Sequence, residues 1–222
     1  DFTDAGGNIY ADYAARWDGA AWQAMGMHPS GESATLNGPV YAIAISGTNV
    51  YVGGAFTGAG GESYADYVAR WDGTQWHALG MSNLNQPVYA LAVSGNNLYV
   101  GGDFTNAGDL PNADYVARWD GAAWQALGAG LNSNVRALAV SGTDVYVGGW
   151  FTNAGGNPNA DKVARWDGAA WRALGNGLNN SVKALAVSGG TVYAGGTFTD
   201  AGGQAVADYV ARWNGTAWQA LG

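Results

Sequence analysis

Hydrophobic and polar positions alternate in four short stretches between residues 135 and 175. The stretches cover 135–140, 145–151, 162–166 and 171–174. Each is rich in β-branched or aromatic residues and is bounded by Gly, Asn, Asp or Ser, which is the pattern of a β-strand. SGTD joins the first two strands and DGAA the last two, and both have the length and the glycine of hairpin turns. No stretch has a helical period, so the pattern predicts a four-stranded antiparallel unit.

The same unit recurs along the chain. The phrase ARWDGAAWQALG at residues 117–128 has four near-copies, and the first tryptophans of successive copies are 54, 48, 47 and 47 residues apart. Four strands repeated at this period are typical of β-propeller blades. We therefore expect one all-β domain over residues 1–222, a β-propeller of four-stranded antiparallel blades. The expected units are a half blade at 1–26 and complete blades at 40–80, 88–128, 135–175 and 182–222.

The copies are unequal, because the outer strand pair occurs five times and the inner pair four times. An outer pair without inner strands leaves an unpaired strand edge, which proteins normally cover. We expect a five-bladed ring in which the missing inner pair comes from chain before residue 1 or after residue 222. The alternative is a pair from another molecule, which would be self-association through the incomplete blade.

Each copy of the phrase carries two tryptophans on either side of a four-residue turn. Rings in these positions can meet across the hairpin, and such aromatic pairs stabilise a fold beyond the area they bury. We interpret the pairs as packing between blades; the alternative is a set of equivalent ligand sites, as in a multivalent lectin. The ten residues are Trp17, Trp22, Trp71, Trp76, Trp119, Trp124, Trp166, Trp171, Trp213 and Trp218.

Each copy also carries an arginine and, before the third strand, an aspartate. We interpret them as a structural ion pair or a hydrogen bond that ties the loop. Calcium binding by these aspartates is the alternative, although no D-x-D-x-D-G spacing supports it. The residues are Arg16, Arg70, Arg118, Arg165 and Arg212, with Asp12, Asp66, Asp114, Asp161 and Asp208.

A second strand that ends in Gly-Gly, then an aromatic residue followed by Asp-Gly and a Trp after the turn, resembles kelch-type propeller repeats over the whole chain. The glycine pairs are Gly53/Gly54, Gly101/Gly102, Gly148/Gly149 and Gly195/Gly196. The chain departs from the usual kelch pattern in the Trp before the Asp and in a uniform FTxAGG segment. This variant resembles repeat regions of bacterial secreted and surface proteins, which implies an extracellular or cell-surface location. The resemblance implies no single activity, because propellers host lectins, adaptors and enzymes.

The amino-acid composition excludes several classes of function. The chain has no cysteine and two histidines, so it offers no thiolate and little for a metal site. With 17 acidic and 9 basic residues, a net charge of −8 argues against binding to nucleic acid or an anionic membrane surface. No apolar run reaches the length of a membrane span. We expect no cofactor and no metal.

Catalytic groups are scarce. His77 occupies a variable position of the fourth strand, where we expect an exposed side chain, and His28 lies in an insertion without a second His or Cys. The chain has no G-x-S-x-G nucleophile elbow, and WDGTQW lacks the full Asp-box pattern of sialidases. We therefore expect that the protein is not an enzyme.

The copies differ most on the face that carries the long loops. Divergent positions are the second residue of the inner strand and the residue after Gly-Gly, the latter being Asp1, Ala55, Asp103, Trp150 and Thr197. These positions flank the mouth of the channel, where a ring has its concave site. The predicted ligand-binding residues are Tyr41, Tyr89, Asp103, Arg136, Trp150 and Lys183. An ordinary variable surface is the alternative interpretation of this divergence.

These observations predict a non-catalytic binding or structural module of an extracellular bacterial protein, with a protein or carbohydrate ligand. The alternatives are a multivalent carbohydrate-binding lectin and a structural repeat unit of a surface assembly or filament. A glycan array would favour the first alternative, and ordered self-association without a ligand would favour the second.

Overall fold

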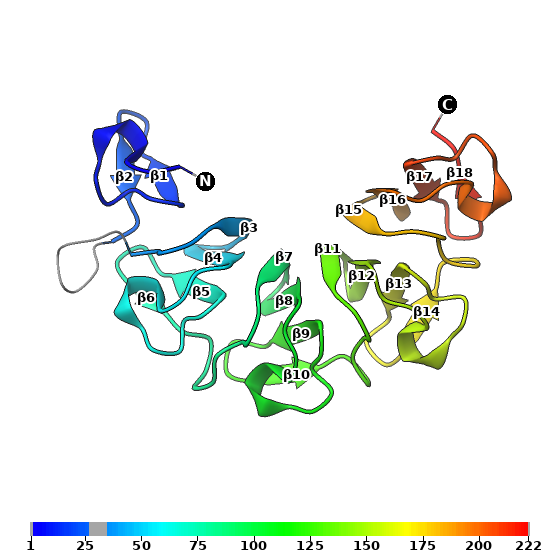
Figure 1. Ribbon diagram of the computed structural model, residues 1–222, viewed down its shortest axis with the longest axis horizontal. Coiled ribbons are helices and arrows are strands. Elements are labelled where there is room, and N and C mark those ends of the chain that lie inside the picture. Colours follow the sequence, from blue (N-terminus) through cyan, green and yellow to red (C-terminus); the bar gives the residue numbers. More distant parts are fainter. Residues whose placement is uncertain (1, 27–34, 222) are drawn as a thin grey trace.

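The computed structural model describes residues 2–26 and 35–221 as an open arc of β-sheets (Figure 1). Asp1 and His28 lie outside the described residues. The strands are β1 (Ala15–Trp17), β2 (Trp22–Ala24), β3 (Val40–Ser46), β4 (Asn49–Gly54), β5 (Val68–Trp71), β6 (Trp76–His77), β7 (Val88–Ser94), β8 (Asn97–Gly102), β9 (Val116–Trp119), β10 (Trp124–Ala126), β11 (Val135–Ser141), β12 (Asp144–Gly149), β13 (Val163–Trp166), β14 (Trp171–Ala173), β15 (Val182–Ser188), β16 (Thr191–Gly196), β17 (Val210–Trp213) and β18 (Trp218–Gln219). Five 3₁₀ turns lie in the long loops: η1 (Ala5–Gly7), η2 (Ala59–Gly61), η3 (Ala107–Asp109), η4 (Ala154–Gly156) and η5 (Ala201–Gly203).

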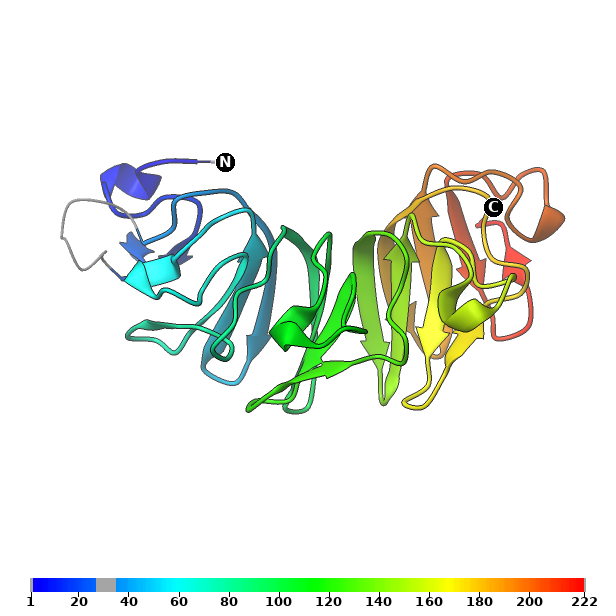
Figure 2. The ribbon, with the colours of Figure 1, turned by 60° about the horizontal axis from the view of Figure 1, so that its bottom comes forward.

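The strands form four sheets of four strands and one sheet of two, all antiparallel within the described residues. Chain order equals spatial order in each sheet, and β3, β7, β11 and β15 lie along the inner side of the arc (Figure 1). Because the strands alternate in direction, both hairpin turns of a sheet lie on one face and the longer links on the other. The molecule is an all-β propeller whose ring does not close within the described residues, as Figure 2 shows from a second side.

The predicted strand bounds needed small corrections. Phe151 and Lys162 were expected in strands, but β12 ends at Gly149 and β13 begins at Val163. Lys162 has a φ of 65°, a left-handed conformation that a strand does not contain. Phe151 is fully buried in the loop that follows β12. The short 3₁₀ turns of the AGG segments were not predicted, because three residues carry no period.

The hydrophobic core lies between the sheets. One cluster joins Tyr51 and Val68 of the first complete blade to Val88 and Trp119 of the next. The Gly-Gly pair makes this packing possible, because a Cβ added at Gly53 would lie 2.5 Å from Val88 Cγ1, too close for two carbons. Because glycine has no side chain at this position, successive blades can pack closely against each other.

The tryptophan pairs pack as predicted in the four complete blades. In all five pairs the ring centroids are 5.4 to 5.7 Å apart. The second indole of each complete blade also donates a buried hydrogen bond to a carbonyl of the preceding unit. These bonds run from Trp76 Nε1 to Met25 O (2.7 Å), from Trp124 to Leu79 O (2.8 Å), from Trp171 to Leu127 O (3.0 Å) and from Trp218 to Leu174 O (2.9 Å).

The first pair corrects the prediction of burial. Trp17 is 53% exposed and Trp22 is 45% exposed, whereas Trp124 is 6% exposed. The same residues in the same local turn differ because no preceding blade covers Trp17 and Trp22 among the described residues. Trp166 and Trp213 are only partly buried.

The repeated aspartates tie the long loops. Asp66 Oδ1 accepts a hydrogen bond from the backbone N–H of Gly58 at 2.7 Å. Equivalent bonds join Asp12 to Asp4, Asp114 to Asn106, Asp161 to Asn153, and Asp208 to Asp200. The repeated arginines do not pair with these aspartates in the described residues; Arg165, for example, lies 3.3 Å from Asp144 Oδ2 on the neighbouring strand. The loop-tying interpretation is confirmed and the ion-pair interpretation is wrong.

Candidate functional site

Four of the predicted site residues occupy one structural position, a β-bulge at the start of each inner strand. Val40 pairs with Gly54 and Ala42 with Gly53, so Tyr41 is an extra residue between two adjacent partners. The same register shift places Tyr89, Arg136 and Lys183 on bulges of β7, β11 and β15. A bulge turns its side chain away from the regular alternation of the strand, and bulges are frequent next to functional sites. The second glycine of each pair permits the bulge, because a Cβ at Gly54 would overlap the carbonyl of Pro39.

The four bulged side chains and Trp150 line a single concavity of about 700 Å³. This volume lies within the range of small-molecule sites. Trp150 begins the long loop after β12, and its N–H donates to Asn134 O at 3.0 Å, which holds the residue beside β11. The structure therefore brings together five of the six residues that the sequence predicted.

Asp103, the sixth predicted residue, does not line the concavity but binds Tyr89, which does. The Tyr89 hydroxyl donates a 2.5 Å hydrogen bond to Asp103 Oδ2. Burial raises the pKa of Tyr89, and the hydrogen bond to the Asp103 carboxylate raises it further. Tyr89 thus remains a neutral donor whose ring is fixed by Asp103.

The two tyrosines and Arg136 form a stack. The Tyr41 and Tyr89 ring centroids are 5.6 Å apart with a 31° angle between the planes. Arg136 Cζ lies 3.8 Å from the centroid of the Tyr89 ring, a cation–π contact. Tyr41 and Trp150 remain about half exposed, at 51% and 47%. Aromatic faces and two cations are therefore available to a ligand in the concavity.

Sequence reasoning did not single out Asn134 and Ser181, which carry buried polar atoms where the inner strands begin, although it named Thr197 as a divergent position. Asn134 Oδ1, Ser181 Oγ and Thr197 Oγ1 are buried and have no hydrogen-bond partner in the described residues. Asn134 O accepts the Trp150 N–H, and Ser181 O accepts the Thr197 N–H, so all three residues lie where the inner strands begin. Unpaired buried polar atoms often mark water or ligand positions. The residue before the inner strand is Pro39 and Pro87 in the first two complete blades but Asn134 and Ser181 in the last two, which is the only sequence signal for these two polar residues.

His77 lies on strand β6 as expected, but its side chain is partly buried rather than exposed. His77 Nε2 lies 2.6 Å from Asp72 Oδ2, and both side chains are partly buried. The equivalent residues Gln125 and Arg172 also contact the turn aspartate of their hairpins. The position is therefore a donor that closes the outer hairpin.

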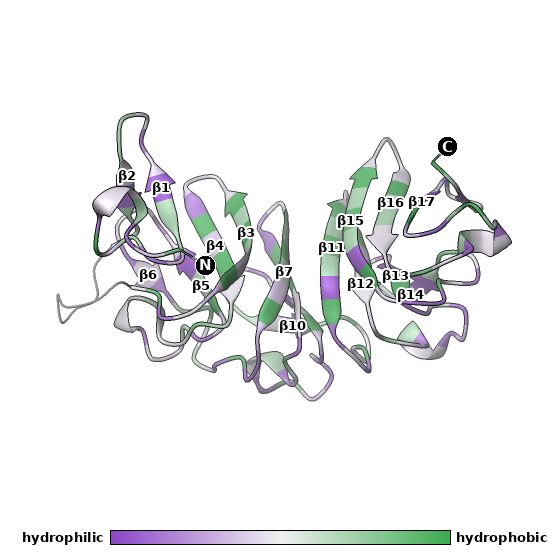
Figure 3. Ribbon diagram, turned by 45° about the horizontal axis from the view of Figure 1, so that its top comes forward, coloured by the Kyte–Doolittle hydropathy of each residue, from purple (hydrophilic) through white to green (hydrophobic). Residues whose placement is uncertain are grey.

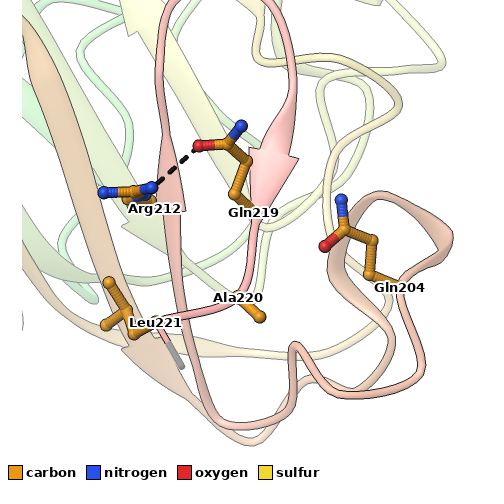
Figure 4. A pocket seen from close by; sticks show the side chains of 5 residues that line it. All are labelled: Gln204, Arg212, Gln219, Ala220 and Leu221. Carbon is orange, nitrogen blue, oxygen red and sulfur yellow. Dashed lines mark hydrogen bonds between the residues drawn. The ribbon is translucent and has the colours of Figure 1, made fainter.

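A second concavity lies on the last blade. It has a volume of about 520 Å³ and is lined by Gln204, Arg212, Gln219, Ala220 and Leu221, with a 3.2 Å hydrogen bond from Arg212 Nε to Gln219 Oε1 (Figure 4). Leu221 is 50% exposed, whereas Leu79 at the same repeat position is 2% exposed. This concavity marks the uncovered end of the arc, where a following blade would pack.

The described residues hold no cluster of three or more His, Cys, Asp or Glu side chains that could bind a metal. Among the same residues, no helix is long and apolar enough to cross a membrane.

The fold and the site together define a β-propeller with a ligand-sized concavity where the inner strands begin. No protein-family model matches the chain, and no curated protein matches it. Among solved structures, the computationally designed Ika4 protein has a TM-score of 0.51 at 20% identity, over 80% of this chain and 91% of that one. An extracellular domain from B. thetaiotaomicron, described as part of a hybrid two-component system, has a TM-score of 0.55 at 12% identity. This match covers 88% of the present chain, which spans only about a fifth (22%) of the bacterial one. At these identities the likeness shows the fold alone.

Proposed function

We propose that the protein is a non-catalytic binding module of an extracellular bacterial protein of the kelch-like repeat type. Its ligand is a carbohydrate that carries carboxylate groups, bound in the concavity between the inner strands. The observation that carries this proposal is the convergence of Tyr41, Tyr89, Arg136, Lys183 and Trp150 on one 700 Å³ concavity.

The residue types determine the ligand chemistry. Half-exposed aromatic rings such as Tyr41 and Trp150 offer flat apolar faces on which the CH face of a sugar ring can pack. Arg136 and Lys183 place two positive charges in a chain whose net charge is −8. Arginine also presents a fork of donors that matches a carboxylate. A ligand with flat apolar faces and carboxylates, such as an oligomer of a uronic acid, satisfies both parts of the site.

The test is a calorimetric titration with oligogalacturonates, with neutral galactose oligomers of the same length as controls. Arg136→Gln and Tyr41→Ala should each weaken binding of the acidic oligomer at least tenfold, and added salt should weaken it further because the contact is charged. Arg172→Gln is the matched control, since Arg172 lies on the outer strand β14 and pairs with Asp167 of the turn before it. Equal affinity for neutral and acidic oligomers, or an equal loss in the control variant, would contradict the proposal.

Stoichiometry separates this function from a multivalent lectin. The repeated tryptophan phrases of the complete blades are engaged with the preceding unit, as Trp124 is with Leu79. The residue at the bulge is tyrosine in the first two complete blades, arginine in the third and lysine in the fourth. The four blades therefore contribute different side chains to one composite site and do not form four equivalent sites. We therefore expect one ligand per chain, whereas four or five would favour the lectin.

A further inference from the structure

In the sheet of β1 and β2, one edge of β1 is unpaired within the described residues. In each of the other sheets, the equivalent edge is paired with an inner strand of the same sheet. In the first complete blade β4 pairs with β5, with Val50 opposite Trp71 and Val52 opposite Ala69. The equivalent strand β1 pairs with β2 alone in the described part of the chain. Its backbone groups therefore present an open edge that can accept another strand.

The loop beside this edge also lacks its usual bond. In the complete blade the Gly54 N–H donates to Tyr67 O at 2.9 Å. Tyr13 occupies the position of Tyr67, and its carbonyl accepts no hydrogen bond from the described residues. The remaining loop bonds are normal, because the Tyr13 N–H donates to Phe2 O just as the Tyr67 N–H donates to Phe56 O. The half blade is folded, and the missing bonds are those that an inner strand pair would supply.

The neighbouring face of β3 is apolar and uncovered. Ile43 is 57% exposed and Ile45 is 67% exposed, although their counterparts in the next blade are only partly exposed. Figure 3 shows that β3 carries strongly hydrophobic segments along its length. A concavity of about 410 Å³ separates Ile43 from the half blade and is lined on its other side by Phe2, Tyr13 and Trp22. Phe2 is 44% exposed, whereas Phe56 at the same repeat position is fully buried.

We propose that this surface, formed by the free edge of β1 and the exposed face of β3, is a docking site for a β-hairpin with the pattern of the chain's own inner strand pairs. The partner is therefore a hairpin of valine, leucine and alanine whose second strand ends in Gly-Gly. The interface is already defined, because the same contacts recur between the complete blades, where β4 packs on β7, β8 on β11 and β12 on β15. Strand addition at an open edge is an established way in which proteins bind peptides.

The glycine pair makes the requirement specific. A Cβ at Gly53 would lie 2.5 Å from Val88 Cγ1, and the first glycine of the docked hairpin occupies the same place beside Val40. A larger residue there would hold the hairpin away from Ile43 and from the β1 edge. Hydrophobicity alone is therefore not sufficient for docking.

The experiment uses a synthetic peptide with the sequence VKALAVSGGTVYAGG, residues 182–196 of this chain, added to the whole protein. Binding is measured by calorimetry and by hydrogen exchange of the backbone amides at residues 14–17. The peptide should bind and should slow exchange at these amides. A control peptide with Gly195→Val should bind at least tenfold more weakly, because its side chain meets Val40.

Two protein variants locate the site. Ile43→Lys should weaken peptide binding at least tenfold, and circular dichroism should show that the variant remains folded, since the side chain is exposed. Ile45→Lys serves the same purpose if Ile43→Lys does not fold. Val210→Lys is the matched control, because Val210 is 47% exposed at the other end of the arc. Absence of binding at a hundredfold excess of peptide, equal binding of the control peptide, or an equal loss in Val210→Lys would overturn the proposal. None of these outcomes depends on the carbohydrate site.

Discussion

Replacing equivalent tryptophans in two different repeats should separate the energy of the local hairpin from the energy of blade packing. Trp22 and Trp124 have the same place in the repeat, the same turn before them and an aromatic partner at 5.6 or 5.5 Å. The two tryptophans differ in whether a preceding blade packs against them. Trp124 is 6% exposed and donates to Leu79 O, whereas Trp22 is 45% exposed and has no such acceptor in the described residues.

The expected costs follow from that difference. Trp124→Ala removes a buried ring, which costs about 3–5 kcal/mol in the free energy of unfolding. It also leaves the buried Leu79 carbonyl without its donor, a loss of about 1–3 kcal/mol that partly overlaps the first. Trp22→Ala removes a ring that is already half in water and breaks no interblade bond, so we expect it to cost roughly half as much or less.

The assay is urea unfolding followed by far-ultraviolet circular dichroism and by hydrogen exchange. Hydrogen exchange is needed because the half blade can unfold separately from the rest of the protein. In a repeat fold the free energy of unfolding is nearly the sum of the stabilities of the single repeats and of the interfaces between them. Trp124→Phe is a useful intermediate, since it keeps an aromatic ring but removes the N–H donor. If Trp22→Ala destabilises the protein as much as Trp124→Ala does, contact with the preceding blade is not the main source of the energy and this reasoning is refuted.

The remaining predictions concern a glycine and an aspartate. Gly101→Ala should destabilise the protein by about 1–3 kcal/mol because the new Cβ would lie 2.5 Å from Val135 Cγ1, whereas Gly195→Ala, with its nearest atom at 3.7 Å, should be tolerated in the same thermal melts. Equal effects of the two substitutions would contradict the packing role of the first glycine. The hydrogen bond from Arg172 and those from the turn N–H groups lower the pKa of Asp167. The stabilisation from the Asp167 carboxylate is therefore complete above its unfolded pKa of about 3.9 and is lost as the pH falls toward the lower folded pKa. Asp167→Asn should melt below the parent protein at pH 6, and the difference in melting temperature should shrink as the pH falls from about 4 to about 2. A difference in melting temperature that stays constant with pH would show that the charge does not matter.

Much of this fold follows from the sequence. The alternation of apolar residues gave the four strands of each blade, and the glycine turns placed their ends to within about two residues. Both signals are local, because a strand's period and a turn's positive φ depend on neighbours in the chain. The repeat then identified Tyr41, Tyr89, Arg136 and Lys183 as the positions that vary, and the structure places all four along one concavity.

Tertiary structure decided what each repeated residue contacts. Trp22 and Trp124 have nearly identical local sequences, yet one is exposed and the other is buried against a neighbouring blade. The bulge that presents Tyr41 depends on Gly54 in the paired strand, and the pairing of His77 with Asp72 depends on the outer hairpin's register. The open edge of β1 likewise exists because no inner pair lies beside it in the described residues. Burial and strand pairing are properties of the partner surface, and a repeated sequence cannot specify whether that partner is present.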